Sequence, residues 1–392
     1  MKKFRRIGIL TSGGDAPGMN AAIRAVARTA LAHGVEVIAF KEGYKGMIED
    51  NVIEITSPTQ LCNIITKSGT FLYTARCDEF KTEEGMAAAI ATCQKYDIDG
   101  IIAIGGDGTF RGATDLSSRG IPTIGIPGTI DNDVTSSDVT IGFDTAMNTV
   151  IEMVDRLRDT CESHARCDVV EVMGRWAGHI ALRTGIATGA SAIAIAEVPF
   201  DEEKAIADMI RQKKAGKRGF IVIVSEGLPG YAEKLAKTIQ ERTGIETKFA
   251  RLAHVQRGGT PTLQDRLLAS EMGVAAVERL FEGESDVVIG KRDGEIVVTG
   301  IKKALTVDRM FKKKITPEEI AALTPEDKAW MKHAVPRSRQ TWKDFITSLT
   351  RSNKTAYKKS CHRGGSSRFL MKEGILYGKH EDRGAHQRDA HP

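Results

Sequence analysis

The chain has 392 residues, of which 41% are hydrophobic and 27% charged, and no stretch approaches the roughly 18 apolar residues that a membrane-spanning helix needs. This length suits two α/β lobes with a cleft between them, because domains usually run to about 100 to 200 residues. The net charge of +5 comes from the residues after 335, where thirteen Lys and Arg face five Asp and Glu, so the rest of the chain is near neutral and nothing in it indicates binding to nucleic acid or membranes.

The first residues and the cysteines both indicate the compartment. Residues 1–6 lead directly into a short strand pattern, without the longer apolar region of a secretory signal. The six cysteines show no Cys-x-x-Cys spacing, and they are Cys62, Cys77, Cys93, Cys161, Cys167 and Cys361. We therefore expect a cytoplasmic protein with reduced thiols rather than disulfides or zinc sites.

Short β-branched runs recur along the chain, each followed by a turn rich in glycine or carboxylates. We expect a helix at 20–32 after the first turn, and strands at 6–10, 100–104, 122–126, 168–172 and 219–224. Such runs suit parallel strands that are buried on both faces. The sequence therefore predicts an α/β fold of two doubly wound, Rossmann-like lobes with an active-site cleft between them. The turns would converge there, because ligands of such sheets bind beyond the carboxyl ends of the strands.

The expected domain organisation is a core at 1–335 followed by an irregular tail at 336–392. One lobe would comprise roughly residues 1–142 with 257–303, and the other roughly 143–256 with 304–335. The tail is basic, lacks sustained hydrophobic periodicity and contains four of the nine histidines. This composition predicts a largely disordered extension.

Two of the glycine-rich turns have features of phosphate-binding loops. The turn Gly13–Gly18 is neither a Walker A loop nor a Gly-x-Gly-x-x-Gly fingerprint, but it precedes a helix whose N-terminus could face phosphate oxygens. In Gly105–Thr109, three glycines would let the backbone approach a polyphosphate, while Asp107 would face a bridging Mg²⁺. Either segment could also be a plain structural turn.

The segment Pro127–Asp133 places two carboxylates, Asp131 and Asp133, two residues apart after a strand. In an extended stretch both side chains would point the same way, so one could accept a proton from a hydroxyl while the other helps to organise metal or water. The alternative is that either Asp caps the following turn. Cations that could bind anions also follow strand ends, and they are Arg166, Arg175, Lys248, Arg251, His254 and Arg257.

Taken together, these segments resemble the signature set of bacterial ATP-dependent 6-phosphofructokinases. The matching segments are Thr11–Asn20, Gly105–Gly108, Pro127–Asp133, Met173–Arg175 and His254–Gly259, in family order across residues 1–335. The resemblance implies that the chain uses Mg-ATP to phosphorylate fructose 6-phosphate at its 1-hydroxyl, giving fructose 1,6-bisphosphate and ADP in glycolysis. It also implies that the first lobe binds ATP and the second binds the sugar phosphate.

The resemblance implies a role for each matching residue. Asp131 would be the base, Thr129 and Arg175 would stabilise the transferring phosphoryl group, and Asp107 would bind Mg²⁺. The ATP site would also include Gly14, Arg76, Cys77, Gly106, Gly108 and Thr109. The sugar-phosphate site would include Thr129, Ile130, Asp131, Met173, Gly174, Arg175, Glu226, His254 and Arg257. Arg166 and Lys248 would join it from a neighbouring subunit, so a homotetramer is the expected assembly.

Several positions distinguish this chain within the resemblance. Diphosphate-dependent relatives place Asp at position 108 and Lys at 128, whereas both are Gly here, which favours ATP over diphosphate. Lys248 and Ala253 occupy positions where the family usually has Arg and Gly. An effector site would use Arg24, Arg28, Arg158, Gly189 and Lys217. Two of its usual residues are replaced, because Ser191 stands where a metal-coordinating Glu is usual and Gly219 where a His is usual.

Other functions stay open from the sequence. Lipid and NAD kinases share a Gly-Gly-Asp-Gly loop, but they do not account for 127–133 or 254–259. A non-catalytic regulatory relative would be expected to lack Asp107, Asp131 or Arg175, and all three are present.

Overall fold

The computed structural model describes residues 4–311, 315–316, 320 and 323–325. The predicted tail at 336–392 lies outside the described residues, as does most of the segment 312–335. The described residues form two α/β lobes, each built on its own sheet.

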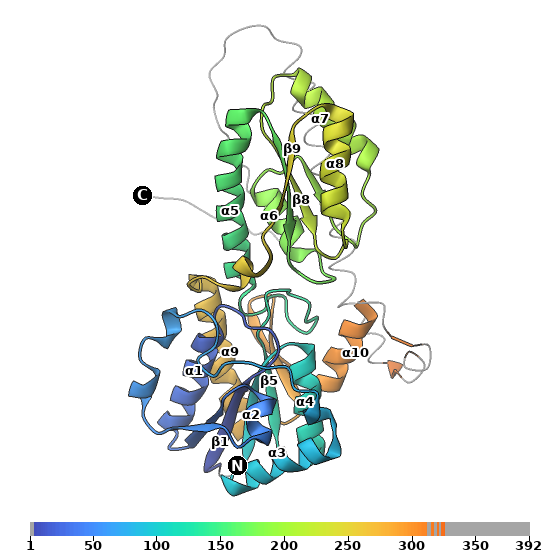
Figure 1. Ribbon diagram of the computed structural model, residues 1–392. Coiled ribbons are helices and arrows are strands. Elements are labelled where there is room, and N and C mark those ends of the chain that lie inside the picture. The colour runs from blue at the N-terminus through green and yellow to red at the C-terminus, as the bar shows by residue number, and fades with distance from the viewer. Residues whose placement is uncertain (1–3, 312–314, 317–319, 321–322, 326–392) are drawn as a thin grey trace, which may run out of the picture. The chain divides into compact units, whose positions relative to one another are not determined.

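The larger sheet has seven strands in the order β11-β10-β5-β4-β1-β2-β3 (Figure 1). The five inner strands are parallel, whereas β3 and β11 run antiparallel at the two edges. The strands are β1 (Arg6–Thr11), β2 (Glu36–Phe40), β3 (Val52–Ile55), β4 (Gly100–Gly105), β5 (Thr123–Pro127), β10 (Val287–Arg292) and β11 (Glu295–Gly300). Strands β1, β4 and β5 therefore end side by side at one edge of the sheet.

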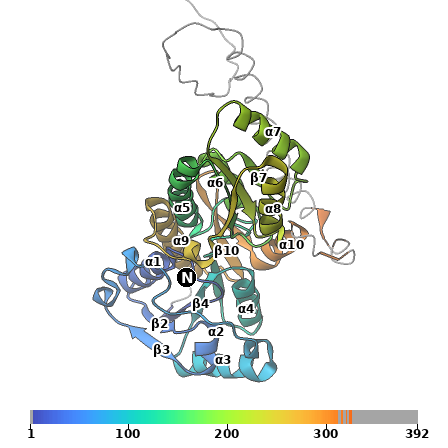
Figure 2. The same ribbon diagram turned by 45° about the horizontal axis from the view of Figure 1, so that its top comes forward.

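Helices cover both faces of this sheet (Figures 1 and 2). On one face lie α1 (Met19–Ala32) and α9 (Leu263–Phe281), which pack against each other. The other face is covered by α2 (Tyr44–Ile48), α3 (Glu83–Lys95), α4 (Asp107–Ser118) and α10 (Ile301–Phe311). Ile301 and Ala304 belong to the core of this face. Residues 304–309, which we had predicted as part of the second lobe, therefore lie beside elements of the first.

The smaller sheet has four parallel strands in the order β7-β8-β6-β9. They are β6 (Cys167–Val172), β7 (Ala192–Ala194), β8 (Phe220–Ser225) and β9 (Thr247–Arg251). One face is covered by α5 (Phe143–His164) and α6 (His179–Ala187), and the other by α7 (Glu202–Lys214) and α8 (Tyr231–Thr243). Four short 3₁₀ helices complete the described elements: η1 (Pro58–Leu61), η2 (Ile64–Thr66), η3 (Glu79–Lys81) and η4 (Ala253–Arg257).

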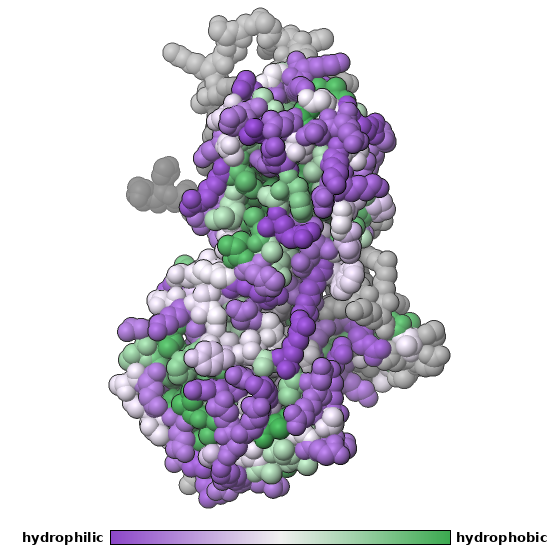
Figure 3. Space-filling model, in the orientation of Figure 1, coloured by the Kyte–Doolittle hydropathy of each residue, from purple (hydrophilic) through white to green (hydrophobic). Residues whose placement is uncertain are grey.

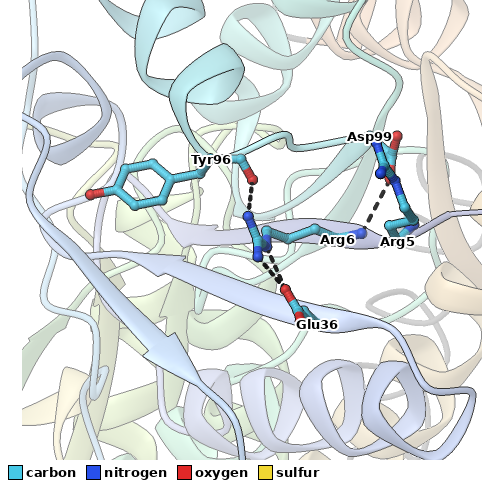
Figure 4. Close-up of polar contacts among 5 residues, drawn as sticks. All are labelled: Arg5, Arg6, Glu36, Tyr96 and Asp99. Carbon is cyan, nitrogen blue, oxygen red and sulfur yellow. Dashed lines mark hydrogen bonds and ion pairs between the residues drawn. The ribbon is translucent and has the colours of Figure 1, made fainter.

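Polar contacts fasten the amino edge of the larger sheet (Figure 4). The Asp99 carboxylate accepts hydrogen bonds from the backbone N–H groups of Arg5, at 2.7 Å, and Arg6, at 3.1 Å. The Arg6 guanidinium donates to the Glu36 carboxylate at 2.8 Å and to the Tyr96 carbonyl at 2.6 Å. This edge is occupied by structural contacts, so the opposite, carboxyl edge is left for ligand-binding loops.

The predicted α/β fold is confirmed. All five predicted strands are present, and their observed bounds differ from the predicted ones by about a residue. Strands β2, β3, β7, β9, β10 and β11 were not predicted. Of these, β3, β7, β9 and β11 lie at sheet edges, whereas β2 and β10 are inner strands. No helix in the described part of the chain is both long and apolar enough to cross a bilayer. The face drawn in Figure 3 mixes hydrophilic residues with separate groups of hydrophobic ones.

Candidate functional site

Three loops meet at the carboxyl edge of the larger sheet. The Thr109 hydroxyl donates to the Ser12 carbonyl at 2.9 Å, which ties the loop after β4 to the turn after β1. The Thr74 hydroxyl donates to the Gly13 carbonyl at 2.7 Å, and the Thr11 hydroxyl donates to the Tyr73 carbonyl at 2.9 Å. The segment that carries the half-buried Cys77 and the exposed Arg76 is thus held beside the first turn.

The glycines of the loop Gly105–Thr109 have two different roles. One stands where no side chain fits, and the others leave open space beside the backbone. A Cβ on Gly105 would lie 2.4 Å from the Ser12 carbonyl oxygen, so no side chain fits there. A Cβ on Gly106 or Gly108 would meet no atom within 4 Å. Gly106 is the N-cap of α4, and as a glycine it gives this helix end no side-chain capping hydrogen bond. Such an end attracts phosphate, because its N–H groups have no partners within the helix.

Asp131 is the most unusual ionisable group of the predicted site. It is 1% exposed, and its Oδ2 lies 3.2 Å from Nε of Arg175. Its Oδ1 is buried and has no hydrogen-bond partner among the described residues. Burial, and then the nearby Asp133 charge, raises the pKa of Asp131 to about 6, although Arg175 and Arg257 oppose the shift. A carboxylate in this state is a stronger base than an ordinary Asp and is still mostly ionised at pH 7.

The backbone around Asp131 is held in an irregular turn. The Asp131 N–H donates to the Thr129 hydroxyl at 3.2 Å, and the Thr129 carbonyl accepts from the Thr140 hydroxyl at 2.6 Å. Asn132 has a φ of 50°, which is uncommon for a residue other than glycine. Thr129, Asp131 and Asp133 are all buried, as is Ile130.

Arg175 lies in a tight turn after β6 that a single carboxylate supports. Gly174 has a φ of 136° and Arg175 a φ of 52°. Their backbone N–H groups both donate to Oε1 of Glu226, at 3.0 Å and 2.7 Å. The Glu226 that we predicted as a sugar-phosphate ligand is therefore also an anchor for the turn that carries Arg175.

The segment η4 brings further predicted residues to the same edges. Nη1 of Arg257 donates to the Asp15 carbonyl at 3.0 Å, so this arginine reaches the first turn beside Gly14. His254 is exposed and Arg257 is half-buried. Between them, Gln256 is fully buried and bonds to the backbone of Met173. Gln256 was missed as a functional residue, although its glutamine type within a charged, glycine-rich segment was a signal.

Two predicted residues lie away from this cluster. Arg166 and Lys248 are at the amino ends of β6 and β9, whereas Met173 and Arg175 follow the carboxyl end of β6. Both cations pair with Glu246, each at 2.9 Å, and they lower the pKa of that carboxyl to about 2. One chain alone therefore does not bring these two cations to Asp131.

The predicted effector residues are only partly gathered. Arg158 donates to the Thr188 carbonyl next to Gly189, and Lys217 donates to the Ser191 hydroxyl at 2.9 Å. Burial, and then the nearby Arg158 charge, lowers the pKa of Lys217. Arg24 and Arg28 lie on α1 of the other lobe.

Gly219 lies close to α5. A Cβ on Gly219 would lie 2.7 Å from Cγ of Glu162, so that side chain occupies the space where a larger residue would point.

The site lies at the carboxyl ends of parallel strands. It combines a glycine loop at a helix N-terminus with a buried carboxylate beside an arginine, and these features are typical of an α/β protein that transfers phosphoryl groups. Residues 6–280 match the family model described as Phosphofructokinase. The chain belongs to the phosphofructokinase family, as its motifs had indicated.

Relatives and solved structures agree. An ATP-dependent 6-phosphofructokinase of Clostridium botulinum (strain Loch Maree / Type A3) is 50% identical over 308 residues, 79% of this chain and 96% of the relative. One of Clostridium tetani (strain Massachusetts / E88) is 49% identical over 312 residues, 80% of this chain and 97% of the relative. A solved phosphofructokinase from Saccharomyces cerevisiae has a TM-score of 0.74 at 32% identity, covering 86% of this chain and 50% of its own. This chain thus spans half the length of the yeast protein.

A pyrophosphate-dependent phosphofructokinase from Marinobacter aquaeolei has the same fold. Its TM-score is 0.68 at 24% identity, covering 77% of this chain and 84% of its own.

Proposed function

We propose that this chain transfers the γ-phosphoryl group of ATP to the 1-hydroxyl of fructose 6-phosphate, giving fructose 1,6-bisphosphate and ADP. The observation that carries the proposal is the buried Asp131, whose pKa is raised and whose carboxylate lies 3.2 Å from Arg175 of the other lobe. The bacterial relatives named for this activity are about half identical over nearly their full length. As a glycolytic enzyme, the protein would work in the cytoplasm.

Asp131 would start the reaction as a general base. Its carboxylate takes the proton of the 1-hydroxyl, and the sugar oxygen forms a bond to the γ-phosphorus while the bond from that phosphorus to the β-phosphate oxygen breaks. ADP leaves with that oxygen. Arg175 and Thr129 would stabilise the negative charge on the phosphoryl group during transfer. The exposed Arg175 can leave its ion pair with Asp131 when the phosphoryl group arrives.

The ATP site would lie over the loops of the larger sheet. The open positions at Gly106 and Gly108 and the N-terminus of α4 suit the phosphates. Gly14, Arg76, Cys77 and Thr109 would complete the site, with the Thr109 hydroxyl bracing the loops rather than facing ATP.

Mg²⁺ fits this site through Asp107, at the first turn of α4 beside those open positions. Proteins bind this cation through one or two carboxylates plus substrate phosphates, and Asp107 would supply one such carboxylate. When bound, Mg²⁺ would neutralise charge on the phosphates.

The sugar phosphate would bind beside the turn after β6. Met173, Gly174, Glu226, His254 and Arg257 would line this part. Arg166 and Lys248 would come from a neighbouring subunit of a homotetramer, because within one chain they lie at the opposite edge of the smaller sheet. These two cations would then leave their ion pairs with Glu246 and bind the phosphate of the sugar instead.

The main alternative is a diphosphate-dependent enzyme with the same sugar substrate. Gly108 argues against it, because its open space suits the α-phosphate of ATP. At Gly128, a Cβ would lie 3.0 Å from Met19 and 3.1 Å from Ile104, so a diphosphate-binding lysine would require these core side chains to shift by a few tenths of an ångström.

The test is an assay of purified protein with fructose 6-phosphate, Mg²⁺ and either ATP or diphosphate. We expect turnover with ATP and little with diphosphate, and Asp131→Ser should lower kcat by about 10² to 10⁴. Turnover with diphosphate alone, or a folded Asp131→Ser variant with normal kcat, would overturn the proposal.

A further inference from the structure

Gln256 is a fully buried polar side chain whose two amide atoms bond to two different segments. Its Oε1 accepts from the Met173 N–H at 3.3 Å, and its Nε2 donates to the Ala253 carbonyl at 3.1 Å. The Met173 N–H needs an acceptor and the Ala253 carbonyl needs a donor. One orientation of the amide satisfies both groups, so the side chain is held in a single position.

The two segments joined in this way carry the residues of the proposed sugar-phosphate site. Met173 begins the turn with Gly174 and Arg175, and η4 contains His254 and Arg257. Strands β6 and β9 are joined by backbone hydrogen bonds. The last of these bonds runs from the Leu252 N–H to the Glu171 carbonyl, at 3.1 Å. Beyond it, Gln256 continues the link.

The backbone at both ends of this link is irregular. Ala253 has a φ of 45° and Gly174 a φ of 136°. A non-glycine residue with positive φ persists where its surroundings hold it in place. The amide of Gln256 provides such a hold at Ala253, and through Met173 it sets where the turn begins. Loss of both bonds would leave two backbone groups at the site without partners.

We infer that Gln256 is a positioning residue for the proposed function: it fixes the spacing between the Met173–Arg175 turn and η4, and so selects for the sugar phosphate without touching it. The inference rests on the function proposed above. Its consequence falls mainly on the sugar-phosphate side, because Thr109, Thr74 and Thr11 tie together the loops over which we place ATP. The η4 segment touches these loops through the bond from Arg257 to the Asp15 carbonyl.

The test compares two Gln256 variants with a control in the same lobe. Gln256→Met keeps the length of the side chain and loses both bonds, whereas Gln256→Glu keeps the acceptor for Met173 and loses the donor to Ala253. We expect Gln256→Met to raise KM for fructose 6-phosphate about tenfold with KM for ATP nearly unchanged. Gln256→Glu should have a smaller effect.

The control is Thr184→Val, which removes a buried hydroxyl that donates to the Ile180 carbonyl within α6, at 2.7 Å. It should lower stability without changing either KM. Equal changes in both KM values, or none in a folded Gln256→Met variant, would overturn the inference.

A measurement on the unaltered protein covers the case in which no variant folds. Hydrogen exchange at the Met173 amide should be slow without substrate, because this N–H donates a hydrogen bond to the buried Gln256. Fast exchange there would contradict the inference. If the unaltered protein does not phosphorylate fructose 6-phosphate at all, the proposed function fails; if it does and the Gln256 variants are normal, only this inference fails.

Discussion

At the scale of single residues, the site depends on a charged group kept where water is excluded. Asp131 is buried with one oxygen facing Arg175 and the other without a partner among the described residues. Its raised pKa means that folding opposes its ionisation. The proposed base is thus held in its buried place at a cost in stability, which is typical of active sites.

This cost predicts a pH-dependent gain in stability for Asp131→Asn. The pKa of Asp131 is about 6 in the folded protein against an ordinary value of 3.8, so the folded state binds more protons between about pH 4 and 6. The stability of the original protein therefore falls as pH rises through that range. The neutral Asn escapes this loss. The variant should be more stable by about 3 kcal/mol above pH 7, with the difference fading towards pH 4.

Urea unfolding of both proteins between pH 4.5 and 8, without ligands, measures this difference. If the difference in free energy of unfolding between the two proteins stays constant with pH, or grows as pH falls, the raised pKa of Asp131 is contradicted.

Substitutions at Gly108 test whether charge at this position decides if ATP is accepted as the phosphoryl donor. As the second residue of α4 it accepts a side chain without contacts within 4 Å, and an acidic residue in the first helical turn is favourable, so Gly108→Asp should fold. The new charge would repel the α-phosphate of ATP. We expect kcat/KM for ATP to fall about tenfold or more, whereas the uncharged Gly108→Asn of similar size should lose much less. Equal losses in the two variants would show that bulk, and not charge, is what matters.

At the scale of elements, a buried carboxylate joins the starts of two helices from different lobes. Asp265, in the first turn of α9, accepts from the N–H groups of Gly142 and Thr145, both at 2.8 Å, and from the Thr145 hydroxyl at 2.5 Å. The N-cap of α5 is Gly142, whose side chain cannot satisfy these N–H groups. Asp265 therefore acts as the cap of α5 from another helix.

Asp265→Ala should consequently destabilise the fold. Two backbone N–H groups would lose their acceptor in a buried place, and we expect a loss of about 2 to 4 kcal/mol in the free energy of unfolding. Urea unfolding measures it. The matched control is Asp155→Ala on the exposed side of α5, which should change stability by less than about 0.5 kcal/mol. A loss no larger than the control's would show that α5 does not need this cap.

At the scale of the whole molecule, the positions of Arg166 and Lys248 predict a site shared between chains. Each of the inactive variants Asp131→Ser and Arg166→Ala damages a different half of such a site. Unfolded and refolded together in equal amounts, they should form assemblies in which about a quarter of the sites combine an intact Asp131 with an intact Arg166. Recovery of activity towards that share, which neither variant shows alone, is the expected result. A mixture as inactive as its components would place both residues in one chain's site.

Regulation also belongs to this scale. Ser191 already accepts a hydrogen bond from Lys217, and as a neutral hydroxyl it cannot offset the desolvation of Mg²⁺ as a carboxylate does. A Cβ at position 219 would lie 2.7 Å from Cγ of Glu162, so a histidine side chain there would meet Glu162. A ligand that binds two states equally shifts neither. We expect half-saturation for fructose 6-phosphate to change less than about twofold with ADP or phosphoenolpyruvate; a several-fold shift with either would contradict this.

Much of the fold and the class of site could be predicted from the sequence. Near-continuous apolar runs predict parallel strands covered on both faces because the run itself is a local property of composition, and parallel strands end at one edge of a sheet. The glycine loops and the carboxylates of 127–133 follow such strands directly, so their meeting at that edge needed no further information. We expect donor choice too to depend on residue type, at Gly108 and Gly128.

The tertiary structure decided which side chains meet. Gln256 bonds to Met173 across 83 positions of the chain, and Glu226 to Arg175 across 51; no periodicity in the sequence records such pairs. The separation of Arg166 and Lys248 from Asp131, and the filling of the space beside Gly219 by Glu162, likewise depend on how strands and helices pack. Local sequence determines where strands and turns form, because backbone preference and the pattern of apolar residues act over a few residues. Partners, burial and the raised pKa of Asp131 depend on packing between distant segments, so only the folded chain defines them.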